Sequence, residues 1–309
     1  MLMNIAMKND AKWPEESVAM SIAGTLRMNK LRWSLRRLYV PVRKNALVLE
    51  VGSGGNPYPR SNVLLDAYEQ TRERHWEPLV QDRPTVLAFG ENLPFKDKAF
   101  DFVIAAHVLE HTPEPEKFLM ELQRVAHGGY IETPDAFMER INPYRDHRLE
   151  VTLRDDCLVI RKKHAWVVDA ELVELYEHRA KRRVTQQLIP LNPSEFHVRY
   201  YWKDNINFRV VNPETDVLWK PVCTDGLSQN VGGMKQKWRL DSLKYLRWLF
   251  SQRRRNRNID LLPLLRCPAC RGGEFERQKG EIVCEGCGAS YDVQQSVFLM
   301  KRSESERCL

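Results

Sequence analysis

The fold is decided by residues 46–55, which read Ala46-Leu47-Val48-Leu49-Glu50-Val51-Gly52-Ser53-Gly54-Gly55. The first six form a continuous apolar run broken only by one glutamate, typical of a parallel strand buried on both faces. Glycines follow at the carboxyl end of that strand, where a backbone without side chains lets a nucleotide-like ligand come close. The stretch therefore predicts an open α/β sheet with a ligand site beyond its strand ends.

Short apolar runs on the carboxyl side of this stretch continue the α/β pattern. Further buried strands are predicted over residues 62–65, 85–87, 100–105 and 130–132, and a helix over 115–125, where apolar residues recur at helical spacing. Alternation of strands and helices is typical of a mostly parallel sheet. Residues 149–153 and 157–161 predict an antiparallel hairpin that closes this sheet.

The flanking segments carry weaker patterns. Residues 1–25 are expected to be irregular, and 226–233 to form a loop. The other predicted elements are a basic helix over 26–38, a helix over 167–179, a hairpin of 196–202 with 206–211, an amphipathic helix over 240–250 and a charged linker over 253–258.

Asp66 ends the second predicted strand and can accept hydrogen bonds from two ribose hydroxyls. It lies only 14 residues beyond Gly52, whereas a dinucleotide fingerprint places its acid about 20 residues on, after a helix whose N-terminus holds the pyrophosphate. Asn56-Pro57-Tyr58-Pro59 stands where that helix would begin. A ligand without phosphates therefore fits better than a dinucleotide.

Three further motifs identify a family. They are Gly90-Glu91-Asn92-Leu93-Pro94-Phe95, Phe100-Asp101-Phe102-Val103 and His107-Val108-Leu109-Glu110-His111. With the glycine turn and Asp66, they make residues 45–163 resemble the class I S-adenosylmethionine-dependent methyltransferases of the type 11 group. The resemblance implies a Rossmann-like sheet, S-adenosylmethionine as cofactor and methyl transfer as the reaction.

The resemblance also implies a cofactor site. Glu50, Gly52, Ser53 and Gly54 would line the methionine and ribose part, Asp66 would hold the ribose hydroxyls, Gly90 and Glu91 would lie along the adenine, and His107 would lie beside the sulfonium. The chain departs from the family pattern at two positions. Asn56 replaces a third glycine, and Phe89 replaces an acid that usually faces the adenine, so packing would replace a hydrogen bond there.

Methyl transfer is an in-line displacement, so alignment supplies much of the acceleration. A general base is needed only where the acceptor is a hydroxyl or a protonated amine. His107, Glu132 and His147 are the candidates for this catalytic role, while Glu110 and His111 are expected to be structural. No Asn/Asp-Pro-Pro-Tyr motif follows the 100–105 strand, which argues against methylation of adenine N6 or glutamine N5.

Two CxxC pairs near the carboxyl terminus predict a structural zinc site. Cys267, Cys270, Cys284 and Cys287 have the spacing that places four thiolates tetrahedrally around one Zn²⁺. Residues 264–300 resemble the small zinc-ribbon proteins that activate methyltransferases as separate subunits, although Gln295-Ser296-Val297 replaces a Gly-Ile-Pro stretch. Fused in one chain, the ribbon is expected to cover an apolar face of the sheet or to help recognise substrate.

Composition bounds the class of protein and its partners. The 309 residues are 43% hydrophobic and carry a net charge of +7, which excludes collagen-like and wholly disordered chains. Residues 27–44 hold seven basic side chains and no acid, and residues 235–257 carry +8, which leaves the rest at −8. Such patches indicate an anionic partner. With no apolar stretch of about 18 residues and no signal peptide, we expect a cytoplasmic protein, peripheral at the inner membrane surface where it meets anionic lipid.

Three functions remain open on the sequence. The first is methylation of a hydroxyl or amine on a small-molecule, glycan or lipid-linked acceptor, since both basic segments also carry apolar and aromatic residues. The second is RNA methylation supported by the ribbon and the basic patches. The third is a non-catalytic scaffold. We expect four regions: a basic segment (1–45), the cofactor-binding core (46–165), a substrate or cap region with a basic linker (166–258) and the zinc ribbon (259–309).

Overall fold

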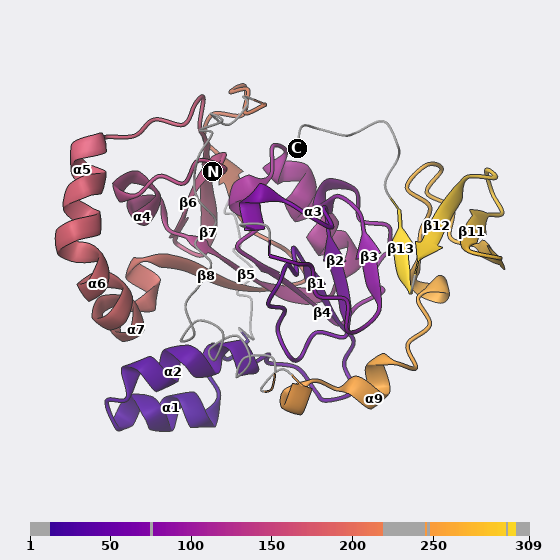
Figure 1. Cartoon of the computed structure of the whole chain (residues 1–309), viewed down its shortest axis with the longest axis horizontal. Helices are drawn as coiled ribbons and strands as arrows, with labels where there is room; N and C mark the ends of the chain where they lie inside the picture. Colours follow the sequence, from indigo (N-terminus) through magenta and orange to yellow (C-terminus); the bar gives the residue numbers. More distant parts are fainter. Residues whose placement is uncertain (1–12, 75–76, 219–244, 246–247, 295, 301–309) are drawn as a thin grey trace, which may run out of the picture.

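The computed structural model describes residues 13–74, 77–218, 245, 248–294 and 296–300. Its centre is a parallel sheet of five buried strands (Figure 1). In spatial order these are β3 (Thr85–Leu87), β2 (Val63–Asp66), β1 (Val48–Val51), β4 (Phe102–Ala106) and β5 (Gly128–Pro134). The chain reverses its direction of travel across the sheet between β1 and β4, and ligands bind at such a switch point in open α/β sheets.

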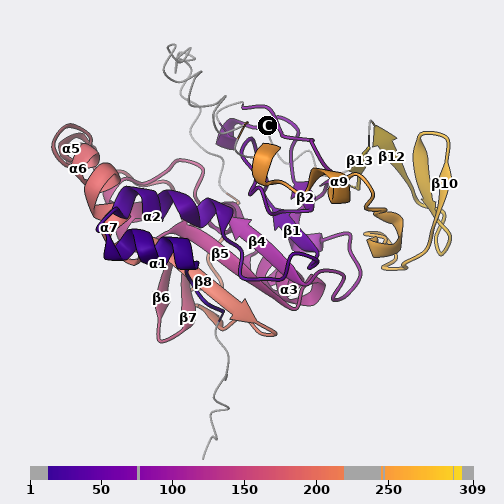
Figure 2. The same ribbon diagram turned by 90° about the horizontal axis from the view of Figure 1, so that it is seen from below.

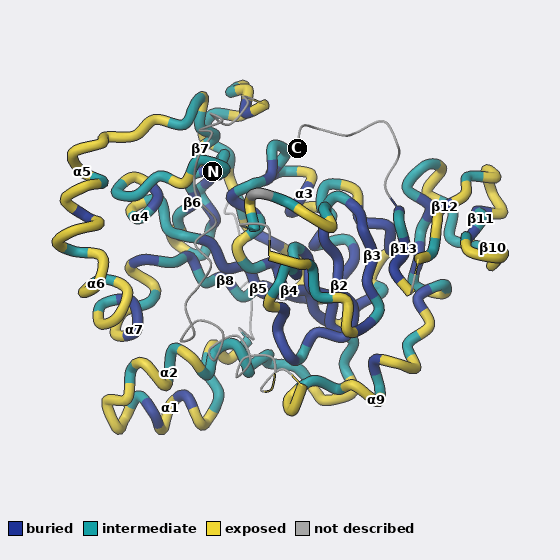
Figure 3. Tube along the Cα trace, in the orientation of Figure 1, coloured by how far each residue is buried: buried dark blue, intermediate teal, exposed yellow. Residues whose placement is uncertain are grey.

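The sheet is covered on one face by α3 (Pro115–Val125), as predicted. Phe118, Leu119, Leu122 and Val125 of this helix are all buried, and the tube view shows the buried residues concentrated in the central strands (Figure 3). On the far side of β5, β8 (His197–Lys203) pairs antiparallel along seven residues. The Rossmann-like methyltransferase fold expected from the sequence is confirmed.

Both predicted hairpins are paired differently from expectation. β6 (Leu149–Arg154) and β7 (Cys157–Lys162) do form a hairpin, but it joins β9 (Phe208–Val210) in a separate three-stranded sheet. The antiparallel strand that closes the main sheet is β8 instead. β8 and β9 were expected to pair with each other, yet they belong to different sheets: β8 pairs with β5 along seven residues, and β9 pairs with β7 along three.

Residues 13–38 are more ordered than the sequence indicated. α1 (Val18–Thr25) falls in a segment expected to be irregular, and Ser17 caps it by accepting a hydrogen bond from the Met20 amide. α2 (Asn29–Leu35) and a 3₁₀ turn (Arg36–Leu38) make up the predicted basic helix. The α1–α2 pair packs side by side and lies against α7 (Ile189–Leu191) (Figures 1 and 2).

The remaining helices lie between β5 and β8 along the chain. α4 (Ala136–Ile141) follows β5. The predicted 167–179 helix is longer than expected: α5 (Ala170–Leu175), α6 (Lys181–Arg183) and α7 alternate with π turns at Tyr176–Ala180 and Val184–Leu188. The wider π turns let a largely exposed helical segment continue to residue 191. Among the described residues, no helix combines the length and apolar character needed to cross a bilayer.

The carboxyl-terminal strands extend the main sheet beyond β3. β10 (Phe275–Gln278), β11 (Glu281–Cys284), β12 (Ser290–Gln294) and β13 (Val297–Leu299) form antiparallel pairs, and β13 then pairs parallel with β3. The result is one ten-stranded sheet (Figure 1). The ribbon was expected to cover an apolar face of the sheet or to help recognise substrate. It covers the edge of the sheet, where unpaired backbone groups of β3 need partners, and a role in substrate recognition stays a prediction.

A few predicted features lie in segments that the structure describes only in part or not at all. The predicted 226–233 loop, most of the 240–250 helix and the cysteines Cys223 and Cys308 lie outside the described residues. The 253–258 linker contains a short helix, α9 (Arg253–Asn256). The four regional boundaries stay predictions; β8 and β13 come from the third and fourth regions, and both strands belong to the main sheet.

Candidate active site and zinc cluster

The turn after β1 is shaped so that only glycine fits. Gly52 and Gly54 have φ of +70° and +57°, the left-handed region that side chains disfavour. A Cβ on Gly52 would lie 2.7 Å from Val108 Cγ2. A Cβ on Gly90 would likewise lie 2.5 Å from the Phe118 ring. Neighbouring side chains of the protein therefore fill the space where these Cβ atoms would lie. The turns after β1 and β3 are left as backbone without side chains, here called the glycine cradle.

Glu50 and Ser53 are buried beside this cradle. The Glu50 carboxylate accepts hydrogen bonds from the Tyr58 amide at 2.9 Å and from the Ser61 hydroxyl, so in this structure it fixes the loop that follows the glycines. Burial raises the pKa of Glu50 to about 7, because desolvation outweighs these bonds and the nearby Arg37. The Ser53 hydroxyl oxygen has no hydrogen-bond partner among the described residues, which suits a ligand that would supply one.

Asp66 lies at the carboxyl end of β2, facing the cradle. One of its oxygens accepts from the Gly54 amide at 2.9 Å, and the other accepts from the Tyr68 amide at 3.0 Å and from Arg74 at 3.1 Å. A carboxylate offers about four acceptor positions, so three are occupied. To accept hydrogen bonds from the two ribose hydroxyls expected here, the Asp66 carboxylate would have to release Arg74.

Glu91 and Phe89 surround the expected adenine position. The Thr112 hydroxyl donates to the Glu91 carboxylate, which ties the 3₁₀ turn Gly90–Asn92 to the segment after β4. The Phe89 ring meets the Tyr68 ring edge to face at 5.9 Å between centroids. The two rings are apolar surface next to the expected adenine position, and packing of Phe89 on the adenine stays a prediction.

His107 follows β4 and lies between two carboxylates. Its Nε2 lies 3.2 Å from Glu132 Oε1 and its Nδ1 lies 3.4 Å from Glu110 Oε1. Loss of solvation opposes the charged ring, but the two carboxylates outweigh it and raise the pKa of His107 above its ordinary value. The side chain is 43% exposed, so His107 is the member of this group that a second substrate can reach.

Glu132, on β5, is buried and fully engaged. Besides His107 it receives hydrogen bonds from the Tyr130 hydroxyl and from Arg36, whose Nη2 lies 3.2 Å from Oε1. Burial would raise the pKa of Glu132, but His107 and Arg36 hold it well below its usual range. Glu132 therefore stays charged and positions His107, rather than facing the mouth of the site.

The amino-terminal basic segment supplies one wall of the site, which the sequence did not indicate. Arg36 stacks on the Trp33 ring at 3.4 Å and is only 15% exposed. Arg37 lies 4.1 Å over the Tyr58 ring and donates to the Asn56 carbonyl beside the glycine turn. These arginines read as surface charge in the sequence because only the tertiary fold brings the 3₁₀ turn against β5 and the glycine loop.

His197, the first residue of β8, is a second site residue that sequence reasoning missed. Its ring lies 5.9 Å from the His107 ring and 5.6 Å from the Trp33 ring. Its Nδ1 has no hydrogen-bond partner among the described residues, and burial lowers the pKa of His197 to about 4. A neutral ring therefore lies beside His107 on the strand that pairs with β5. The sequence predicted that this strand pairs with residues 206–211, so His197 was not expected at the site.

His147 does not face the same space. It lies just before β6, where Nδ1 is 2.6 Å from the Glu139 carboxylate, and Glu139 also receives Lys163 at 2.7 Å. The ring stacks on Tyr144 and meets His111 edge to face, at centroid distances of 4.9 Å and 4.7 Å. The structure thus brings His107 and Glu132 together and places His147 in a neighbouring cluster.

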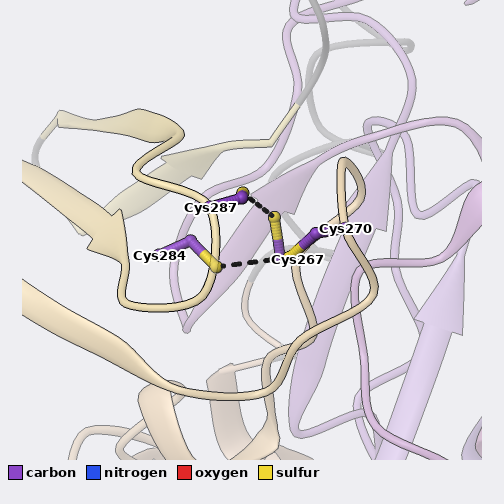
Figure 4. Close-up of side chains that lie close together, drawn as sticks. All are labelled: Cys267, Cys270, Cys284 and Cys287. Carbon is purple, nitrogen blue, oxygen red and sulfur yellow. Dashed lines mark hydrogen bonds between the residues drawn. The ribbon is translucent and has the colours of Figure 1, made fainter.

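The four ribbon cysteines form a compact cluster (Figure 4). The Sγ atoms of Cys267 and Cys287 are 3.7 Å apart, and those of Cys270 and Cys284 are 3.6 Å apart. Tetrahedral Zn²⁺ with Zn–S bonds of about 2.3 Å separates its sulfurs by about 3.8 Å. The donor set and spacing therefore fit a zinc ion.

Comparison with known proteins identifies two parts of the chain. Residues 49–131 match the model of a methyltransferase domain, and residues 258–296 match that of the Trm112p-like proteins. A stretch of 81 residues is 46% identical to MJ1123 of Methanocaldococcus jannaschii, a protein described as uncharacterized. The match covers 26% of this chain and only 40% of that relative. The chain therefore contains a methyltransferase domain and a Trm112p-like domain, as the sequence motifs predicted.

Solved structures give weaker similarity. A chain from the complex of the Haloferax volcanii Trm112 methyltransferase activator with a proposed methyltransferase is 14% identical, with a TM-score of 0.33 over 60% of this chain and 94% of that chain. The PH0226 protein of Pyrococcus horikoshii is 17% identical, with a TM-score of 0.32 over 60% and 91%. At these scores the fold assignment rests on the strand order described above.

Proposed function

We propose that the protein is an S-adenosylmethionine-dependent methyltransferase. The observation that carries the proposal is the geometry at the carboxyl ends of three adjacent parallel strands: the glycine cradle follows β1, Asp66 ends β2 and His107 follows β4. It lies within the methyltransferase-domain match. The bound cofactor would supply an activated methyl group on a sulfonium. Glu50, Gly52, Ser53 and Gly54 would hold its methionine and ribose part, Asp66 the ribose hydroxyls, and Gly90 and Glu91 the adenine.

We assign the acceptor-facing role to His107. Of the three candidate bases it alone has an exposed side chain, at 43%, against 0% for Glu132 and 9% for His147. Because the two carboxylates keep His107 protonated at neutral pH, it would orient the acceptor by hydrogen bonding and would act as a base only above its raised pKa. Glu132 would be a positioning residue that orients the ring. His107→Gln should lower kcat with little change in cofactor affinity, whereas Glu132→Gln should also alter the pH profile of kcat.

The acceptor we favour is a hydroxyl or amine on a glycan or small molecule carried by lipid. The segment that supplies Trp33 and Arg36 to the site also carries exposed apolar side chains on α1, on α2 and in the turn between them, namely Val18, Ile22, Leu26, Met28 and Leu31. Basic residues such as Arg27 and Lys30 lie among them. A segment with exposed apolar and cationic side chains suits an anionic membrane, and the same segment leads into the turn that carries Arg36 to Glu132.

Labelled methyl transfer tests both proposals. The protein is incubated with S-adenosylmethionine carrying a radioactive methyl group and with lipid, glycan, small-molecule and RNA fractions of cells. We expect label in the lipid or glycan fraction and protein bound to anionic vesicles, and both should fall with Leu26→Glu/Leu31→Glu. Absence of measurable S-adenosylmethionine binding by calorimetry would contradict the enzyme and favour a scaffold.

RNA is the second acceptor supported by a specific observation. α9 and its flanks expose Arg253, Arg254 and Arg257, next to a Trm112p-like domain. Labelled RNA in the same experiment, together with RNA binding that weakens steeply with salt, would favour this alternative. Replacing the three exposed arginines with Gln should then reduce binding, whereas the α1–α2 variant should not.

A further inference from the structure

A second cluster of metal-ligand residues lies next to the proposed active site. Glu110 and His111 belong to the 3₁₀ turn after β4, and His147 precedes β6. One carboxylate oxygen and one ring nitrogen from each histidine all lie within 4.8 Å of one another. Residues from two distant segments of the chain therefore bring a nitrogen, nitrogen and oxygen donor set together under the surface.

Both histidines are oriented through Nδ1. In His147, Nδ1 lies 2.6 Å from the Glu139 carboxylate, and in His111 it lies 3.2 Å from the Asp146 carbonyl oxygen. Both partners accept hydrogen bonds, so Nδ1 of each ring carries the proton and Nε2 keeps its lone pair. A carboxylate or carbonyl behind the imidazole is the arrangement that supports metal-binding histidines.

The environment of the Glu110 carboxylate indicates that this cluster binds a cation. The residue is 2% exposed, and neither carboxylate oxygen takes part in a hydrogen bond with another described residue. The nearest cationic group is His107, 3.4 Å from Oε1. His107 offsets the charge at Oε1, whereas Oε2 has no hydrogen-bond partner among the described residues. A buried carboxylate oxygen without a partner is costly and rare in native proteins, and a cation between Glu110 and the two imidazoles would satisfy Oε2.

We propose that Glu110, His111 and His147 bind a divalent transition-metal ion. Two imidazoles and one carboxylate suit Zn²⁺ or Fe²⁺ and leave coordination positions open. Ligand bonds of about 2.0–2.2 Å require the three donor atoms to draw in to ~3–3.5 Å from one another, a small side-chain rotation. Glu73, 3.9 Å from His111 Nδ1, is a further acid at the rim.

Metal content measures this site directly. The full-length protein equilibrated with Zn²⁺ and freed of excess ion should hold two equivalents per chain, one in the cysteine cluster and one here. Glu110→Gln and His147→Gln should each hold one equivalent, while the exposed control His178→Gln keeps two. One equivalent in the unchanged protein, or two in both variants, would overturn the proposal.

Cobalt substitution of the unchanged protein covers the case in which the variants fail to fold. The first equivalent of Co²⁺ should give thiolate charge-transfer absorption from the cysteines. A second should bind without adding to that absorption, as nitrogen and oxygen ligands require, and His111→Gln should remove only this second equivalent. Neither measurement uses cofactor or acceptor, so failure here leaves the methyltransferase proposal untouched, and the reverse holds.

Discussion

Asp66 shows how one side chain serves both the fold and the proposed ligand. Its carboxylate holds the Gly54 amide, which fixes the glycine turn, and it also pairs with Arg74. Only one of about four acceptor positions remains. If the cofactor binds through Asp66 as proposed, its ribose hydroxyls would displace the Arg74 contact, and Arg74 would lower the affinity by competing for the same carboxylate.

Asp66→Asn should weaken S-adenosylmethionine binding by about 10- to 100-fold. Hydrogen bonds to a charged group contribute about 1.5–3 kcal/mol, and each 1.4 kcal/mol is tenfold in affinity. Calorimetric titration measures the change, and Glu174→Gln, an exposed glutamate on α5, is the matched control. Unchanged affinity in Asp66→Asn would mean that other residues hold the ribose.

Glu50 gives a pH dependence with a defined sign. An unfolded glutamate releases its proton near pH 4.5 and the folded Glu50 near pH 7. Between these values the folded protein binds more protons, so its stability falls as pH rises from about 4.5 to 7. The loss attributable to this residue is about 3 kcal/mol, at 1.36 kcal/mol per pKa unit.

Urea unfolding from pH 4.5 to 8 isolates this contribution when the unchanged protein is compared with Glu50→Gln. The free energies of unfolding should shift in favour of the Gln variant as pH rises, because the amide does not titrate. A constant difference across the range would contradict the raised pKa.

At the scale of elements, the 3₁₀ turn after α2 is tied to β5 by a buried ion pair. Arg36 on this turn pairs with Glu132 on β5, and the Glu132 side chain is fully buried. The α1–α2 pair is thus held to the catalytic side of the sheet by charge as well as by packing. Breaking such a pair leaves an unpaired buried charge, which costs more than the pair contributes.

Arg36→Met should therefore destabilise the protein by about 3–5 kcal/mol. In a Glu132→Gln background the same change should cost much less, since no carboxylate is then left unpaired. Denaturant unfolding of the four proteins gives the coupling energy as a double-mutant cycle. Equal costs in both backgrounds would show that the contact is not energetically coupled.

The ribbon strands are the second element whose stability depends on more than their own packing. β10 to β13 enclose few large apolar side chains, so their fold should depend on the metal held by the cysteines. Cys284→Ser should raise amide hydrogen exchange in β11 to β13 and also in β3, the partner of β13. Cys157→Ser, on β7, is the control and should leave all these strands protected. Protection of β3 that survives Cys284→Ser would show that the edge is covered independently of the metal.

On the scale of the whole molecule, one hydrogen-bonded sheet joins the Trm112p-like domain to the methyltransferase core. The ribbon also contacts the loop after Glu91: the Lys96 amide donates to the Leu264 carbonyl, and Arg266 donates from its amide to Pro94. Leu265 and Phe95 are both fully buried at this junction. The fused domain therefore supports the segment expected to bind the adenine.

Residues 1–257 expressed alone should aggregate, because the β3 edge and the Phe95 pocket would be exposed. Co-expression with residues 258–309 as a separate chain, supplied with zinc, should restore a monodisperse complex. Size-exclusion chromatography with light scattering measures both outcomes. A monodisperse, cofactor-binding 1–257 fragment would show that the core needs no such cover.

Local patterns in the chain were enough for the parallel strands, α3, the glycine turn and the cysteine cluster. Each of these depends on residues near one another in sequence: apolar runs make strands, glycine admits positive φ, and CxxC spacing presets a metal geometry. The same reasoning brought His107 and Glu132 to one edge, because parallel strands end together.

The tertiary structure alone decided which strand closes the sheet, where the ribbon attaches and which residues wall the site. β8 pairs with β5 although more than 60 residues separate the two strands in the chain, and no local sequence pattern indicates this pairing. Arg36 and Arg37 look like surface charge until the 3₁₀ turn packs on β5. Long-range pairing is selected by the total burial and hydrogen bonding of the finished fold, so it is visible only there.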